Sequence, residues 1–201
     1  ENNKTKKLNL TSPDIISLHK KLEKLKKNKI DNVILEASSH GLSQGRLDGI
    51  DFKAGIFTNF SQDHLDYHKT MKNYFNSKMI LFSKLLKNKK IIIADKEIRE
   101  FPKLKKIAER KKLILKTIDE NNFINLKQFP LIGKFQVKNL TMALLAAKIS
   151  GLSIKKINSV LSYIKSVNGR LELIRILSNQ TKIFIDYAHT PHALETALQS
   201  L

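Results

Sequence analysis

The sequence contains no cysteine, which removes disulfide bonds, thiolate metal sites and thiol nucleophiles from the chemistry available to it. It has no apolar run near the roughly 20 residues that a membrane helix needs. Its N-terminal segment also lacks the basic start, apolar core and small-residue cleavage site of a secretory signal. We therefore expect a protein of the cytoplasm that does not insert into a membrane.

Negative charge and arginine are scarce as well. The 201 residues carry 37 Lys and Arg against 18 Asp and Glu, for a formal net charge of +19. Such an excess is typical of nucleic-acid-binding proteins. However, only five of these residues are arginine, the side chain best suited to reading bases. The lysines are spread over many segments, so a solvated basic surface accounts for them, and we predict no nucleic-acid partner.

What is present is the composition of a globular protein, with 41% hydrophobic and 27% charged residues. Short apolar runs alternate with amphipathic patterns of helical spacing, which predicts an α/β fold with a mainly parallel sheet flanked by helices. The predicted strands are 33–35, 54–60, 90–94, 113–118 and 182–186. The predicted helices are one that begins at Pro13 with Ser12 as its N-cap, then 71–86, 97–111, 133–150 and 153–164, and one that begins at Pro191.

Two residues with metal-binding side chains follow neighbouring predicted strands. Glu36 comes directly after 33–35, and His64 lies just past the strand that ends at Thr58-Asn59. The carboxyl ends of parallel strands lie at one edge of the sheet, so both side chains are expected within reach of one ion. Carboxylate oxygen and imidazole nitrogen without sulfur favour Mg²⁺ or Mn²⁺. The alternative is a surface carboxylate and a hydrogen-bonded loop histidine.

Lys78 breaks the pattern of its predicted helix, because it falls inside the apolar stripe. That stripe consists of Met71, Tyr74, Phe75, Leu81, Phe82 and Leu85. A lysine aimed at the core is costly unless it is neutralised or paired, and a neutral amine is a nucleophile, including towards CO₂. The product carbamate is an anion that can bind a metal beside His64. The alternative is a lysine that extends along the core edge to solvent.

Six segments of the chain, in order and with matching spacing, resemble the motifs of the Mur ligase family, and within it the tripeptide synthetases. These segments are 36–46 (EASSHGLSQGR), 57–68 (FTNFSQDHLDYH), 74–78 (YFNSK), 131–139 (LIGKFQVKN), 168–172 (NGRLE) and 186–191 (DYAHTP). The resemblance implies that residues 1–166 form the central ATP-binding domain, similar to P-loop NTPases. It further implies that 167–201 begin a Rossmann-like C-terminal domain.

The resemblance implies an ATP-dependent amide ligase of peptidoglycan synthesis, with ATP and Mg²⁺ as cofactors. The substrates would be small molecules: UDP-MurNAc-L-Ala-D-Glu, activated as an acyl phosphate, and meso-diaminopimelate, whose amine attacks it. L-Lysine is the alternative amino acid, and nothing in residues 1–201 separates the two. The family resemblance also leads us to expect a monomer. Two other classes stay open as alternatives: a basic nucleic-acid-binding domain, and a metal-dependent hydrolase that uses Glu36 and His64 without ATP.

Site residues follow from the resemblance position by position. Metal binding falls to Glu36, His64 and a carbamylated Lys78, and catalysis to Lys78, His64 and Arg170. The UDP-MurNAc-dipeptide is held by Thr11, Ser12, Ser38, Gln44 and Arg46. The nucleotide is held by Asn139 at the adenine, Arg170 near the γ-phosphate, Asp186 at the ribose and His189 beside it.

Some of these positions also have a purely structural interpretation. Asn139 could instead be a helix cap, and Asp186 a strand-end carboxylate. Gln136 stands where the family more often has Asn, so a structural hydrogen bond is expected there. Asp63, His68 and His192 are expected to fix loops. No G-x-x-G-K-[ST] loop occurs in the chain. The resemblance implies that this loop lies before residue 1 and the motif that selects the amino acid after residue 201, so we predict that these 201 residues alone are inactive.

Overall fold

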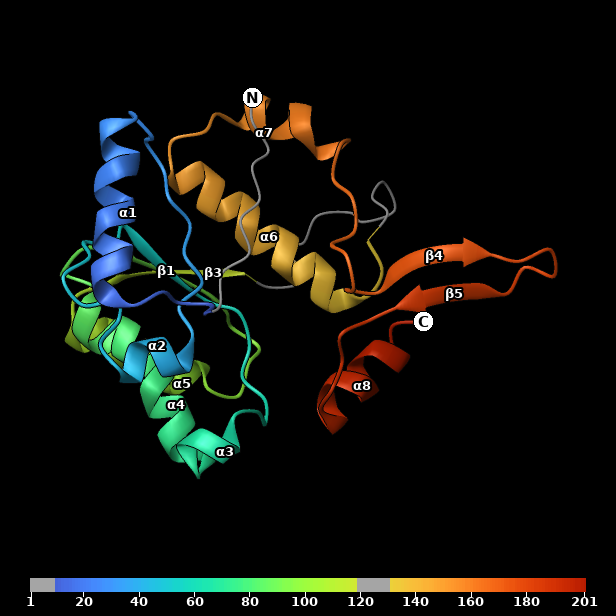
Figure 1. Cartoon of the computed structure of the whole chain (residues 1–201), viewed down its shortest axis with the longest axis horizontal. Helices are drawn as coiled ribbons and strands as arrows, with labels where there is room; N and C mark the ends of the chain where they lie inside the picture. The colour runs from blue at the N-terminus through green and yellow to red at the C-terminus, as the bar shows by residue number, and fades with distance from the viewer. Residues whose placement is uncertain (1–9, 119–130) are drawn as a thin grey trace. The chain divides into compact units, whose positions relative to one another are not determined.

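The computed structural model describes residues 10–118 and 131–201 (Figure 1). The first described part contains α1 (Ile15–Lys27), α2 (Ser39–Ser43), β1 (Ala54–Phe57), α3 (Leu65–His68), α4 (Met71–Ile80), a π-helical turn (Leu81–Leu85), β2 (Ile91–Asp95), α5 (Phe101–Arg110) and β3 (Ile114–Ile118). The second contains α6 (Lys134–Ile149), α7 (Ile154–Leu161), β4 (Glu172–Ile176), β5 (Lys182–Ile185) and α8 (Pro191–Leu198).

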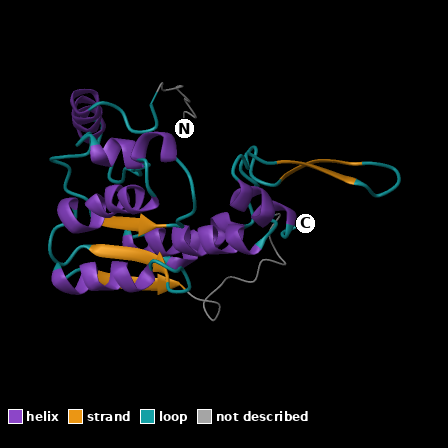
Figure 2. Ribbon diagram, turned by 90° about the horizontal axis from the view of Figure 1, so that it is seen from below, coloured by secondary structure: helices purple, strands orange, loops and turns teal. Residues whose placement is uncertain are grey.

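Strands β1, β2 and β3 form one sheet in that order, with helices flanking it (Figure 2). The N–H of Ile114 donates to the carbonyl of Lys90, and the N–H of Lys96 donates to the carbonyl of Ile118. Both partners advance in the same direction, as in parallel pairing. Four of the five residues of the middle strand, Ile92–Asp95, are buried, which explains the continuous apolar run at 91–94. The predicted α/β class and these three strands are confirmed.

The chain divides into two compact units. The first unit comprises residues 1–55, 64–92 and 102–115. Within it, α4 packs against both α2 and α3 (Figure 1). The core of this unit includes the fully buried side chains of Leu47, Phe82, Leu86, Ile92 and Leu104. Tyr74, Phe75, Leu81 and Phe82 of the predicted apolar stripe are buried, so the helix at 71–86 is confirmed, although its last turn is π-helical.

The second unit comprises residues 56–63, 93–101 and 116–201. In it, α6 packs against α7, and β4 pairs with β5 in an antiparallel hairpin. Strand β5 confirms the run predicted at 182–186, whereas β4 was not predicted. Several apolar side chains of the hairpin and α8 are exposed, among them Ile174, Ile176, Ile183, Ile185, Leu194 and Leu198. Leu140, Met142, Ile157, Leu171 and Ala197 are buried.

The predicted start of the first helix is wrong by two residues. Asp14, not Ser12, is the N-cap of α1, and its carboxylate accepts the N–H of Ser17 at 2.9 Å. This hydrogen bond holds the pKa of Asp14 below its ordinary value. Pro13 therefore lies outside the helix. The prediction failed because the Ser12 hydroxyl binds residues 24 to 26 positions away, a contact that local capping patterns do not reveal.

The strand predicted at 33–35 is also wrong. These residues are irregular, and Ile34 is 93% exposed. A β-strand exists only through a ladder with a neighbour, and within the described ranges no strand pairs with this segment. Glu36 therefore follows an irregular segment instead of a strand end, so the argument that placed it beside His64 from sheet geometry does not hold.

Candidate active site

Ser12 joins the start of α1 to the loop before α2, both in the first unit. Its side chain is 1% exposed, and its hydroxyl donates to the carbonyl of Glu36 at 2.9 Å. Because that bond uses its single proton, the Ser38 hydroxyl is the donor in the 3.0 Å bond between the two serines. The N–H of Ser38 also donates to Ser12 at 3.1 Å. Two residues predicted to hold the same substrate are thus in contact.

Gly41, in α2, leaves the space that this contact requires. A β-carbon at Gly41 would lie 2.6 Å from Cβ and 2.7 Å from Oγ of Ser12. We predict that Gly41→Ala forces Ser12 away from the Glu36 carbonyl and lowers the free energy of unfolding by about 1–3 kcal/mol, as overpacking does in tight sites. Urea unfolding measures the change. A variant as stable as the wild type would show that this segment relaxes freely.

Arg46 extends the cluster from the turn after α2. One guanidinium nitrogen donates to the carbonyl of Ser12 at 2.9 Å, and another donates to the side-chain oxygen of Gln44. Arg46 is half-buried and Gln44 is exposed. Thr11, beside Ser12, is exposed. The five residues predicted to hold the UDP-MurNAc-dipeptide therefore all lie in the first unit, and four of them form a connected hydrogen-bond network.

His64 and Lys78 lie near the same aromatic ring. The ring centroids of His64 and Tyr74 are 5.7 Å apart, and the Lys78 ammonium lies 5.0 Å from the Tyr74 centroid. His64 adopts a left-handed backbone conformation (φ 53°), and it is exposed, whereas Lys78 is half-buried. The predicted break in the apolar stripe is therefore real: Lys78 lies at the edge of the core, over an aromatic face.

The metal ligands predicted from the sequence could supply only part of the coordination shell of a metal ion. In the described part of the chain, no group of three His, Cys, Asp or Glu side chains is placed to hold a metal. Mg²⁺ commonly takes only one or two protein ligands and completes its shell with phosphate oxygens and water. His64, a carbamate on Lys78 and the carboxylate of Glu36 are donors of suitable chemistry for such a site.

His68 fixes α2 to α4. It is 5% exposed, its Nε2 lies 2.9 Å from the Ser39 hydroxyl and its Nδ1 lies 3.3 Å from that of Ser77. Ser77 gives its own proton to the carbonyl of Asn73, so Nδ1 of His68 carries a proton and donates to the Ser77 hydroxyl. Burial, and then the charges of His40 and His64, lower the pKa of His68. His68 is therefore a structural hydrogen-bond partner, as predicted, but it joins two helices and does not fix a loop.

The residues predicted to hold the nucleotide lie in the second unit. Asn139 is exposed within α6 and is not a helix cap, since Gly133 occupies that position. Gln136, 7% exposed, donates from its amide to the carbonyl of Arg170 at 2.9 Å. The predicted structural hydrogen bond of Gln136 is confirmed, and it holds the backbone of a residue predicted to lie near the γ-phosphate.

Asp186 organises the end of β5. One carboxylate oxygen accepts the N–H of Leu171 at 2.8 Å, and the other accepts that of Ala188 at 2.7 Å. Arg170 lies 5.1 Å from the Tyr187 ring, and His189 lies 3.9 Å from the carboxylate of Asp63. Asp186 thus has the structural role considered above, and each oxygen keeps a further lone pair for a ligand.

A buried ion pair in the second unit was not predicted. Asp95, at the end of β2, is 1% exposed, and the Lys138 ammonium lies 2.5 Å from its carboxylate and 3.0 Å from that of Glu97. Burial lowers the pKa of Lys138, but the hydrogen bonds to Asp95 and Glu97 outweigh it, so the pKa is raised overall. The sequence signal that could have indicated this ion pair is an aspartate directly after the apolar run 91–94.

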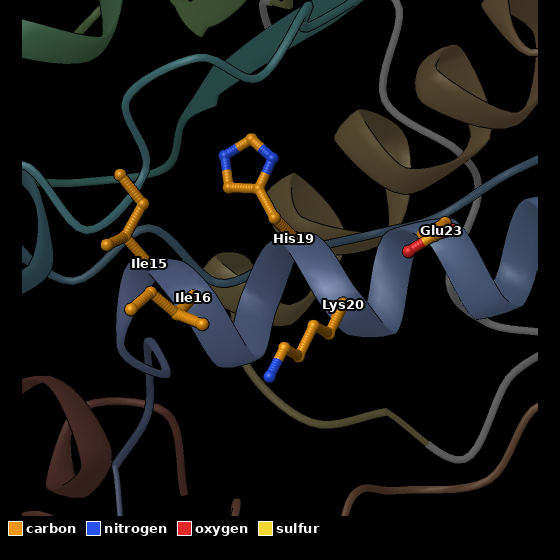
Figure 3. Close-up of a pocket in the computed structure, with 5 residues that line it drawn as sticks. All are labelled: Ile15, Ile16, His19, Lys20 and Glu23. Atoms are coloured by element: carbon orange, nitrogen blue, oxygen red, sulfur yellow. The ribbon is translucent and has the colours of Figure 1, made fainter.

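One surface depression is lined by Ile15, Ile16, His19, Lys20 and Glu23 of α1 (Figure 3). It contains none of the predicted site residues.

No helix within residues 10–118 or 131–201 is both long and apolar enough to cross a bilayer.

The fold and these motif residues define a Mur ligase. The chain belongs to that family: the sequence model of the Mur ligase middle domain matches residues 1–147. It is 38% identical over 214 residues to the UDP-N-acetylmuramoyl-L-alanyl-D-glutamate–2,6-diaminopimelate ligase of Rickettsia bellii, covering 96% of this chain and 44% of that protein. The corresponding ligase of Chelativorans is 37% identical over 215 residues, with the same coverage of both chains. The chain therefore spans less than half the length of these relatives.

Two solved structures of Mur ligases are also similar to this chain. A structure of a UDP-N-acetylmuramoyl-L-alanyl-D-glutamate–2,6-diaminopimelate ligase superposes with a TM-score of 0.72 at 30% identity, covering 94% of this chain and 43% of that one. MurF from Acinetobacter baumannii superposes with a TM-score of 0.61 at 17% identity, over 74% of this chain and 37% of MurF. At that identity the second match shows the fold alone.

Proposed function

We propose that this chain is part of an ATP-dependent ligase that joins meso-diaminopimelate to UDP-MurNAc-L-Ala-D-Glu. The geometry that supports this most directly is the hydrogen-bond network of Ser12, Ser38, Gln44 and Arg46. These residues come from the start of α1, the loop before α2 and the turn after it. The relatives named for this activity match over nearly the whole chain.

The reaction forms an amide from a carboxylate, so the carboxylate must first be activated. ATP gives its γ-phosphoryl group to the D-Glu γ-carboxylate, the amine then attacks the acyl phosphate, and phosphate leaves as the C–N bond forms. Bound Mg²⁺ would neutralise charge on the transferring group. His64, Glu36 and a carbamate on Lys78 would hold the metal, and the cationic Arg170 would stabilise phosphoryl oxygens.

The nucleotide side of the proposal rests on the second unit. Asn139 is exposed on α6 and has no capping role, so its side chain is accessible to a ligand such as adenine. Asp186 would accept ribose hydroxyls, with His189 beside the nucleotide. We further propose a domain boundary between residues 166 and 167, a cytoplasmic location and a monomer.

An assay of phosphate release by the complete protein that the gene encodes tests the proposal. We expect ATP, Mg²⁺ and UDP-MurNAc-L-Ala-D-Glu to release phosphate only when diaminopimelate is added. Release with L-lysine instead would identify the lysine-adding ligase of the same family. Folded protein that releases phosphate with neither amino acid would overturn the proposal. Steep salt-dependent DNA binding by such protein would then favour the nucleic-acid alternative.

A further inference from the structure

Tyr67 belongs to the hydrogen-bond network of Arg46, although no motif role led to it. A guanidinium can only donate, so the Gln44 oxygen that meets Arg46 is the acceptor and the other end of that amide is the NH₂ group. That NH₂ group donates to the Tyr67 hydroxyl oxygen at 3.1 Å. The direction of each bond is therefore set by Arg46, and the Tyr67 oxygen is an acceptor from Gln44.

The Tyr67 proton has only a weak, neutral partner in the structure. The Ser43 hydroxyl donates its single proton to the carbonyl of His40 at 3.0 Å, so it is the acceptor in its 3.2 Å bond to the Tyr67 hydroxyl. An anionic ligand oxygen is a stronger acceptor than a neutral hydroxyl and would take this proton from Ser43. Tyr67 is 41% exposed, so a ligand can approach the residue.

The ring of Tyr67 is held in place while its hydroxyl stays accessible. Its centroid lies 4.2 Å from that of His40 and 4.8 Å from that of His68, which is itself locked by two serines. The hydrogen bonds with Ser43 and Gln44, and then the charge of Arg46, lower the pKa of Tyr67 and make its hydroxyl a better donor. Anionic oxygens bind such donors more strongly than a neutral serine does.

We propose that Tyr67 is a substrate-contacting residue whose hydroxyl donates to an anionic oxygen of the UDP-MurNAc-dipeptide, beside Gln44 and Arg46. This inference rests on the proposed function. The substrate supplies such oxygens from two sources, the diphosphate and the D-Glu carboxylates. In either case the bound oxygen replaces Ser43 as the partner of the Tyr67 proton.

This inference is tested by calorimetric titration of the complete protein that the gene encodes. We expect Tyr67→Phe, which keeps the ring, to weaken binding of UDP-MurNAc-L-Ala-D-Glu by roughly 10- to 100-fold, the effect of one hydrogen bond to a charged group. ATP binding and the melting temperature should not change. The loss should persist when Gln44 is already Ala, because a direct contact does not act through Gln44.

Tyr163→Phe is the matched control, since Tyr163 is 79% exposed and far along the chain in the second unit. It should bind as the wild type does.

Titration with UDP-MurNAc-L-Ala separates the two oxygen sources. If Tyr67→Phe also weakens binding of this ligand, the contact is to the diphosphate; if it does not, the contact is to D-Glu. Unweakened binding by Tyr67→Phe overturns the Tyr67 assignment while the ligase proposal stands. Wild-type protein that binds neither the dipeptide substrate nor ATP overturns both.

Discussion

Lys78→Met should lower kcat by about 10²–10³-fold, the effect of removing one group that stabilises charge in a transition state. Methionine keeps a long apolar side chain over the Tyr74 ring, where the lysine ammonium lies 5.0 Å from the centroid. It removes the amine that would form the carbamate. The protein should therefore fold normally and bind ATP, and the loss should appear in the rate of phosphate release.

Lys72→Met is the control for this variant, because Lys72 is exposed on the same helix, α4. It should leave the rate unchanged. Wild-type activity should also rise when bicarbonate is added to CO₂-depleted buffer, whereas Lys78→Met should not respond. Full activity of Lys78→Met would show that Lys78 has no part in the reaction and extends along the core edge to solvent.

Lys138→Met should lower the free energy of unfolding by about 3–5 kcal/mol, as the loss of one partner of a buried ion pair does. Asp95 is 1% exposed and would be left with no cation against its carboxylate, while Lys138 is only 25% exposed. The acidic Glu97 beside it would then add repulsion. Urea unfolding of the chain measures the difference.

Two comparisons make this prediction specific. Lys148→Met, at the exposed last turn of the same helix, should cost little. Adding Asp95→Asn to Lys138→Met should recover part of the loss, because an amide needs no counter-charge and can still accept the N–H of Glu97. Equal stability of Lys138→Met and the wild type would mean that water reaches Asp95 and replaces the lysine.

Most helices and strands were predictable because local patterns determine them. The run Ile91–Ala94 is short and apolar throughout, which is typical of a strand buried on both faces. The stripe along α4 and the Pro191 start of α8 are likewise local signals. Lys78 was identifiable from helix periodicity alone, because a charge inside an apolar stripe is visible in the sequence.

The errors have a common origin in long-range contacts. Ser12 has the chemistry of an N-cap, but its hydroxyl is bound to Glu36 and Ser38. Residues 33–35 have the composition of a strand, but a strand needs a neighbouring ladder. Neither the hydrogen bonds of Ser12 nor the absence of a strand at 33–35 can be predicted from the neighbouring residues in the sequence.

The residues alone were enough to predict the α/β class, the three strands of the main sheet and, through six spaced motifs, the family. These features depend on side-chain periodicity and on residue identity at fixed spacing. The folded structure was needed to show that Arg46 orients Gln44 and Tyr67, that buried His68 links α2 to α4 and that Lys138 neutralises Asp95. Those contacts join residues that are up to 43 positions apart, and hydrogen-bond direction and burial exist only once the chain has folded.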